Sequence, residues 1–404
     1  MKNTLAVLCG EKHNCDHYKS LLQALPQLGQ HHFVLSLELP RDYNPMIKRF
    51  MQKASHIYEM YNDGKMQFEE AEKKVDKLEE KLINSMIKKS PDTLYLQVDK
   101  KNFYLRREEK TREWVAENRL TEKEHNRKDH KLDLGHMTDV IKEVVRHNVL
   151  NRGNLEVYAV DISTREMKEQ ERKGNLYVSI KVPEACQQLV EDYLKKAGKS
   201  ARLGKTPTEG LKQRITDAFQ KAGLSPDDKF FEDFFDRLNN VAKRQQKDKD
   251  LKVKFEPMDE FFGVAQDITR AFVDYRDQRM AGNIEKKEDS RYGLCNIKRI
   301  AQSRNFYYPG PRLIHWGGAY HLGEIKRETN LSKELKKVGF PYVVTADAYT
   351  GELRNYPTDF VFESHKGLLK AVDDGIKMQL KSQGFPVYHH VYPTKTQERE
   401  REGR

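Results

Sequence analysis

Short apolar runs, bounded by glycine, proline or charged residues, recur along the chain. The clearest lie at 5–9, 33–39, 155–160, 312–317 and 342–346. Continuous runs of this length are typical of strands that are buried on both faces of a parallel sheet. Weaker runs predict further strands at 93–98, 176–182 and 359–364.

The segments between these runs follow helical spacing. From about Asn14, leucines at 21, 22, 25 and 28 form the inner face of a first helix. Further helices are predicted over 44–90, 137–149, 260–284, 324–338 and 367–382. Strands that alternate with helices in this way predict an α/β fold.

Two long charged segments interrupt the alternation. Residues at about 44–133 and 184–255 are predicted to be helical insertions with solvated charged faces. Within the first, 104–133 is almost wholly charged and predicts an exposed helix or a mobile insertion. We expect one α/β domain over 1–404, a layered sandwich with a central, mostly parallel sheet, followed by a disordered tail at 394–404.

Two strand ends share a Gly-x-x-His pattern. Gly10 and His13 follow the first run, and Gly318 and His321 follow the run at 312–317. Because ligands of open α/β sheets bind at the carboxyl ends of the strands, two such histidines can face one cleft. For either copy alone, an ordinary strand-to-helix turn with an incidental histidine explains the pattern equally well.

Each copy continues into a helix, a glycine and a strand that carries an acid near its end. The acids are Glu38 and Asp347, and a carboxylate at the end of an apolar strand is costly unless it is paired. Asp161 ends another strand, either as a site residue or as a cap. Arg279 follows Tyr275 on the apolar face of the 260–284 helix, where a guanidinium needs an anionic partner.

Charge and cysteine content narrow the possible classes of protein. Basic residues exceed acidic ones by 73 to 62, a net charge of +11, but the two signs are interleaved. This indicates a solvated surface rather than a nucleic-acid interface, and none of the usual binding motifs is present. The four cysteines form no Cys-x-x-Cys pair, so reduced thiols are expected.

No apolar run approaches the roughly 20 residues of a membrane span. The first strand is also too short to be the core of a signal peptide. We therefore expect a cytoplasmic protein, with secretion by a route without a signal as the alternative.

Three motifs resemble a superfamily that joins the erythromycin esterases, the ChaN haem-binding proteins and the Tiki and TraB proteins. The first is Gly10-Glu11-Lys12-His13 with Glu38, and the second is the helical stretch 276–281, Arg-Asp-Gln-Arg-Met-Ala. The third is the stretch 317–323, Gly-Gly-Ala-Tyr-His-Leu-Gly. The second motif departs from the family pattern, because Arg279 is followed by Met280 in place of the usual asparagine.

The resemblance implies an α/β sandwich with a cleft at the strand ends. Its members include metal-dependent proteases, esterases with a water activated by histidine, haem-binding proteins and some toxin domains. It therefore indicates the architecture better than the substrate.

The resulting hypothesis is a hydrolase of ester or peptide bonds. His13 would activate water, and Glu11 and Glu38 would orient His13 or join a metal. His321 would be the second histidine of the site, and Arg279 would stabilise an oxyanion or a substrate carboxylate. A divalent metal, Zn²⁺, Mn²⁺ or Co²⁺, would suit a ligand set drawn from the histidines and acids. The candidate ligands are His13, Glu38, His321, His17 and Asp347.

Two other classes of function stay open. One is a protein of the same fold that binds haem or another ligand without turnover. The other is a bacterial effector or toxin that uses its charged insertions to recognise a target. For the enzyme, the expected partner is a small molecule or a peptide substrate.

Overall fold

The structure is a computed structural model. It describes residues 5–11, 17–29, 33–90, 103–107, 114–118, 133–172, 273–285, 297–303, 311–322, 330–348 and 358–384, with isolated residues between 210 and 236. The chain divides into two compact units. The first comprises Met1–Ser90, Val98–Ser163 and Arg276–Arg404, and the second comprises Pro91–Gln97 and Thr164–Tyr275.

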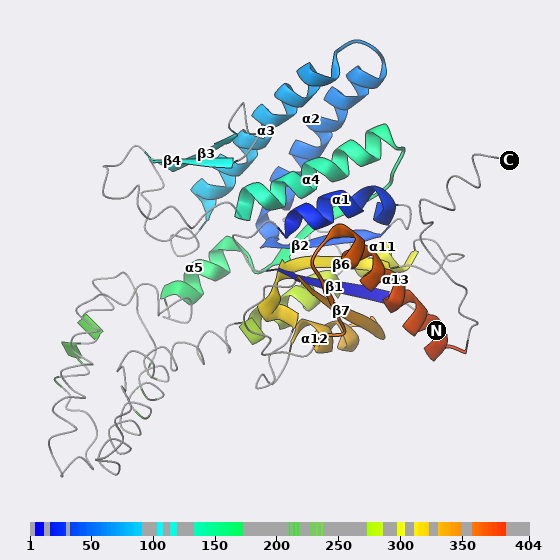
Figure 1. Cartoon of the computed structure of the whole chain (residues 1–404). Helices are drawn as coiled ribbons and strands as arrows, with labels where there is room; N and C mark the ends of the chain where they lie inside the picture. Colours follow the sequence, from blue (N-terminus) through cyan, green and yellow to red (C-terminus); the bar gives the residue numbers. More distant parts are fainter. Residues whose placement is uncertain are drawn as a thin grey trace, which may run out of the picture. The chain divides into compact units, whose positions relative to one another are not determined.

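A six-stranded sheet forms the centre of the first unit (Figure 1). Its order is β5-β2-β6-β1-β7-β8, and every neighbouring pair is parallel. The strands are β1 (Leu5–Glu11), β2 (Val34–Pro40), β5 (Glu156–Asp161), β6 (Pro311–Gly318), β7 (Tyr342–Ala348) and β8 (Phe360–Phe362). The α/β fold and the central sheet predicted from the apolar runs are confirmed, and the described sheet is wholly rather than mostly parallel.

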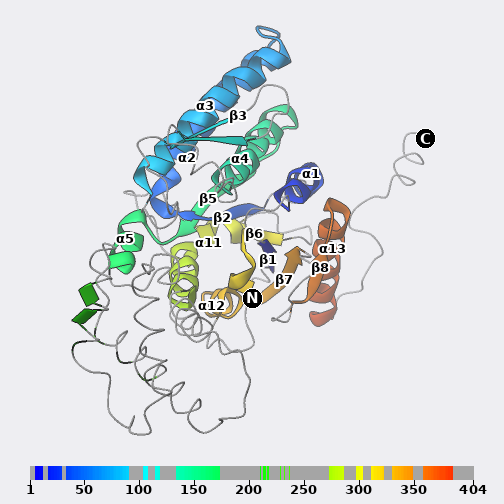
Figure 2. The same cartoon turned by 60° about the vertical axis from the view of Figure 1, so that its left-hand side comes forward.

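Helices cover both faces of the sheet (Figure 2). On one face, α11 (Ile297–Ser303), α12 (Leu331–Lys337) and the helix over 273–285 contribute to a core with alternate residues of the strands, among them Leu8, Val34 and Leu313. Helix α13 (His365–Ser382) packs on β1, β7 and α1 (Tyr18–Leu28). The sheet between helical layers is the layered sandwich that the alternation predicted.

A helical bundle extends the first unit. It consists of α2 (Asn44–Asn62), which follows the short helix η2 (Arg41–Tyr43), together with α3 (Phe68–Lys89) and α4 (Asp133–Leu150). Inside it, Lys142 Nζ lies 2.6 Å from Asp76 Oδ1 and 3.2 Å from Glu72 Oε2, and Glu79 is fully buried nearby. The helices predicted over 44–90 and 137–149 are thus confirmed, and they pack as part of the first unit.

Part of the charged stretch 104–133 differs from the prediction. Strands β3 (Phe103–Arg107) and β4 (Trp114–Asn118) pair antiparallel there, where we expected an exposed helix or a mobile insertion. Phe103–Arg107 has only three apolar residues before its two arginines, too short a run to stand out as a strand in a charged stretch. The predicted strands at 93–98 and 176–182 and the tail at 394–404 lie outside the described residues.

The helix after the second copy of the Gly-x-x-His pattern also differs from the helix predicted over 324–338. His321 lies in a short 3₁₀ helix, η4 (Ala319–Leu322), and α12 begins only at Leu331. In the second unit, the structure describes α5 (Thr164–Arg172) and isolated helical residues.

Candidate functional site at the carboxyl ends of the strands

Five charged side chains meet at the carboxyl edge of the sheet. Glu38 and Asp161 lie at the ends of the neighbouring strands β2 and β5, and His321 follows β6 in η4. Arg276 and Asp277 come from the helix over 273–285. We call these five residues the strand-end cluster. Parallel strands deliver their last residues to one edge, which is why residues far apart in sequence converge here.

Arg276 joins the two strand-end acids. Its Nη2 donates to Glu38 Oε1 and to Asp161 Oδ2, and its Nε lies 3.1 Å from both oxygens of Asp161. Asp161 is only 1% exposed. The planar fork of a guanidinium suits two carboxylates at once, so Arg276 fixes the position of Glu38 relative to β5.

His321 lies between two carboxylates. Its Nδ1 is 2.5 Å from Asp277 Oδ1, and its Nε2 is 3.0 Å from Glu38 Oε1. Burial disfavours the charged ring, but Glu38 and Asp277 outweigh that effect and raise the pKa of His321 to about 9. His321 is therefore an imidazolium at neutral pH, and it holds a proton at Nε2 that points toward Glu38.

Glu38 is the centre of the strand-end cluster. Its Oε1 accepts hydrogen bonds from Arg276 and His321, and its Oε2 accepts one from the backbone N–H of Gly318 at 2.5 Å. The side chain is 6% exposed. Three donors hold this buried carboxylate in one orientation.

A second imidazole, His315, lies in β6, three residues before the strand ends at Gly318. It is buried in β6, and its Nδ1 lies 3.0 Å from Ser36 Oγ in β2. Burial and, after it, the positive charge of His321 lower the pKa of His315 to about 3. The two imidazoles are thus held in opposite protonation states.

The structure brings two of the sequence-predicted site residues, Glu38 and His321, into direct contact. Asp347 is buried near the end of β7, in register with Gly10 of β1. Because side chains alternate along a strand, Glu11 falls on the opposite face from Gly10. There, burial and the charge of Glu11 raise the pKa of the Cys9 thiol.

The other candidates have different positions. His17 is half-buried directly before α1, and His13 lies outside the described residues. Arg279 is half-buried in the helix over 273–285, one turn after Arg276. The arginine that contacts Glu38 is Arg276.

Sequence reasoning did not select Arg276, Asp277 or His315, and it left Asp161 open. Arg276 and Asp277 stand inside the 276–281 motif, where the spacing from Tyr275 favoured Arg279 instead. Asp161 carried the same strand-end signal as Glu38. For His315, the only signal in the sequence that could indicate a site residue is its place as a polar residue in the apolar run at 312–317.

The described donors do not fit a divalent metal. Both ring nitrogens of His321 face carboxylates, and Glu38 Oε1 faces the guanidinium of Arg276. Among the residues that the structure describes, no group of three or more histidines, cysteines or acids is arranged to hold a metal ion. A metal that involves His13 stays a prediction.

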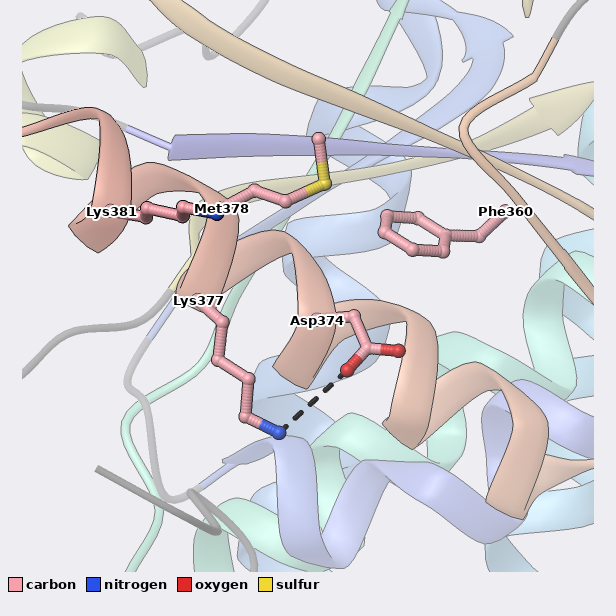
Figure 3. A pocket seen from close by; sticks show the side chains of 5 residues that line it. All are labelled: Phe360, Asp374, Lys377, Met378 and Lys381. Atoms are coloured by element: carbon pink, nitrogen blue, oxygen red, sulfur yellow. Dashed lines mark ion pairs between the residues drawn. The ribbon is translucent and has the colours of Figure 1, made fainter. Parts of the chain in front are cut away.

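A separate hollow of about 600 Å³ lies between α13 and β8 (Figure 3). Phe360, Met378 and Lys381 line it together with Asp374 and Lys377, whose ion pair measures 3.7 Å. None of these five residues belongs to the strand-end cluster.

In the described part of the chain, no helix has both the length and the apolar character needed to cross a membrane.

Fold and site together define an α/β protein with a buried carboxylate–imidazole network at the carboxyl ends of a parallel sheet. Among solved structures, the chain is similar to the open conformation of a mutant erythromycin esterase, EreC. The two share 10% sequence identity with a TM-score of 0.29, over 86% of this chain and 70% of the esterase. No model of a protein family and no curated protein matches the sequence.

Proposed function

We propose that the protein is a hydrolase of ester or peptide bonds and that its reaction takes place at the strand-end cluster. The observation that carries the proposal is the position of His321 between Asp277 and Glu38. A carboxylate on Nδ1 orients the ring and stabilises its charged form, which leaves Nε2 to exchange a proton with the reaction. The motifs that resemble the esterase superfamily support the same class of reaction.

Each group has a role in the proposed reaction. Glu38 takes a proton from water as the water oxygen bonds to the acyl carbon. The bond from that carbon to the leaving oxygen or nitrogen then breaks, and the leaving atom takes the Nε2 proton of His321. Glu38 then releases its proton to solvent, and His321 takes up a proton at Nε2, which restores both groups. Arg276 and Asp277 position these two residues.

The test is a panel of carboxylic esters, lactones and peptides given to the purified full chain. We expect hydrolysis of at least one class by the wild type and a loss of about 100-fold or more in His321→Gln. The matched control is His56→Gln, because His56 lies in α2 with its side chain 74% exposed. This control should keep the wild-type rate.

Two outcomes would contradict the proposal. One is a wild type that cleaves nothing on the panel, and the other is a His321→Gln variant as active as the wild type. A Soret band in the purified protein would instead support the haem-binding alternative.

A further inference from the structure

The side chain of His315 lies on the same face of the sheet as that of Glu38 in the strand-end cluster. It pairs in register with Ser36 of β2, and Glu38 is two residues further along the same strand. Alternation therefore places His315, Ser36 and Glu38 on the same face, the one that also carries Leu8 and Leu313. This is the face covered by the helix that supplies Arg276.

The hydrogen bonds of Ser36 favour one tautomer of His315. Ser36 Oγ lies 3.0 Å from His315 Nδ1 and 3.5 Å from the Ile314 carbonyl oxygen. If the hydroxyl donates to that carbonyl, Oγ accepts the hydrogen of Nδ1, and both groups of Ser36 are satisfied. The other ring nitrogen, Nε2, then holds a lone pair.

That nitrogen has no partner within the described residues. His315 is only 1% exposed, and its buried Nε2 makes no hydrogen bond with these residues. Buried polar atoms are nearly always hydrogen-bonded, so an isolated acceptor in the interior indicates a missing ligand. A neutral ring is the form that can accept, and the lowered pKa of His315 keeps it neutral near pH 7.

Gly317 lies beside both acceptors. A Cβ built there would lie 2.8 Å from Glu38 Oε2, 2.9 Å from Glu38 Cβ and 2.9 Å from His315 Nε2, so the absence of a side chain lets these groups lie close to one another. Two hydrogen-bond acceptors therefore approach the same side of one glycine. A molecule with two donors can bridge Glu38 Oε2 and His315 Nε2, which makes no hydrogen bond with the described residues, and water is the smallest such molecule.

We propose that His315 Nε2 and Glu38 Oε2 together bind the water that attacks the substrate. This inference rests on the proposed hydrolase function and adds the position of the nucleophile. One O–H of the water donates to His315 Nε2, and the other donates to Glu38 Oε2, which takes that proton during attack. His315 orients the water and keeps its own protonation state throughout.

The first test compares two variants of His315 in the full chain. His315→Leu removes the acceptor and replaces it with an apolar side chain suited to the interior. We expect an unchanged or higher melting temperature, a loss of about tenfold or more in kcat, and little change in KM. His315→Gln, which keeps an acceptor oxygen, should retain more activity than His315→Leu. Wild-type kcat in His315→Leu would overturn the proposal.

The second test does not depend on activity. In full chain labelled with ¹⁵N at histidine, the His315 signals, assigned with His315→Gln, should show an unprotonated Nε2 and contact with a long-lived water. A protonated Nε2, or the absence of that water, would overturn the proposal. If the wild type hydrolyses nothing, the proposed function fails, and this measurement alone decides whether the two acceptors hold water.

Discussion

Glu38 is the residue on which the proposed chemistry depends, because it contacts both the proposed acid and the proposed water site. One carboxylate oxygen faces His321 and Arg276, and the other faces Gly318 and the Gly317 position. A single carboxylate can therefore orient the imidazolium with one oxygen and take a proton from the water with the other.

Substitution of Arg276 should reduce stability and hydrolysis more than substitution of Arg279. A lysine cannot reproduce the fork that joins Glu38 to Asp161, so Arg276→Lys should lower the free energy of unfolding by about 1–3 kcal/mol and reduce hydrolysis. Arg279→Lys, one turn later, is the matched comparison. Urea unfolding and kcat of the two variants check this, and a larger loss of activity in Arg279→Lys would favour the sequence-based choice.

The two imidazoles should give the stability of the protein opposite pH dependences. The folded chain holds the His321 proton more tightly than the unfolded chain, with a pKa of about 9 against 6.5, because the charges of Glu38 and Asp277 outweigh burial. That stabilisation is complete below pH 6.5 and is lost as the pH rises to about 9. For His315, with a pKa of about 3, stability is lost as the pH falls from 6.5.

Urea unfolding from about pH 4 to about pH 10 measures these dependences. His321→Gln should flatten the alkaline decline, and His315→Leu should flatten the acid decline. If His315→Leu steepens the acid decline, the ring is not held neutral in the folded protein.

At the scale of single residues, the sequence predicts Glu38 and His321 as candidates, and the structure places these two side chains in contact, but the sequence does not predict their partners. Burial of a strand-end carboxylate and a Gly-x-x-His turn are local signals that can be seen in the chain. The pairing of Arg276 with Asp161 joins positions 115 residues apart and depends on how the helix over 273–285 lies across the sheet. No local pattern contains that information.

At the scale of the elements, the short helix η4 sets the position of His321, and η4 packs on β1. Gly10 is in register with Gly317, and a Cβ at Gly10 would lie 2.4 Å from Leu322 Cδ1 and 2.9 Å from the Cα of Ala319. The absence of a side chain at Gly10 thus allows η4 to pack directly on the strand.

Gly10→Ala should displace η4. We expect a loss of about 1–3 kcal/mol in the free energy of unfolding, because the new methyl group meets backbone as well as side chain, together with lower activity. The control is Gly282→Ala in the helix over 273–285, where no atom lies within 4 Å of the added Cβ. It should stabilise the protein by about 0.5–1 kcal/mol. Equal effects of the two substitutions would argue against a close packing of η4.

The elements of the sheet were predictable, whereas their order was not. The runs that became β1, β2, β5, β6 and β7 are buried on both faces and therefore contrast strongly with their surroundings. In each of β3 and β4, only three apolar residues precede the polar ones, and the surrounding charges favour the prediction of an exposed helix or a mobile insertion there.

Across the whole first unit, the helical bundle and the strand-end cluster share no residue, although Asn44 of α2 is hydrogen-bonded to Ala159 of β5. Inside the bundle, carboxylates of α3 share the ammonium of Lys142. The bundle contributes none of the five residues of the strand-end cluster. Stability and catalysis should therefore respond independently to changes in the bundle.

Lys142→Met tests that independence. Removal of the ammonium leaves buried carboxylates without the cation that they share, which should lower the free energy of unfolding by about 3–5 kcal/mol at neutral pH and less in acid. Lys77→Met, at an exposed position of α3, should change it by no more than about 0.5 kcal/mol. The folded fraction of Lys142→Met should keep the wild-type kcat, and a large loss of kcat would contradict the separation.

The most direct test of the role of Glu38 is kcat/KM of Glu38→Gln on a substrate that the wild type hydrolyses, measured with circular dichroism of the same sample. Glutamine keeps the shape of the side chain but cannot take a proton from water. We expect native circular dichroism and a fall in kcat/KM of about 100-fold or more. A folded Glu38→Gln variant with wild-type kcat/KM would contradict the central role of Glu38.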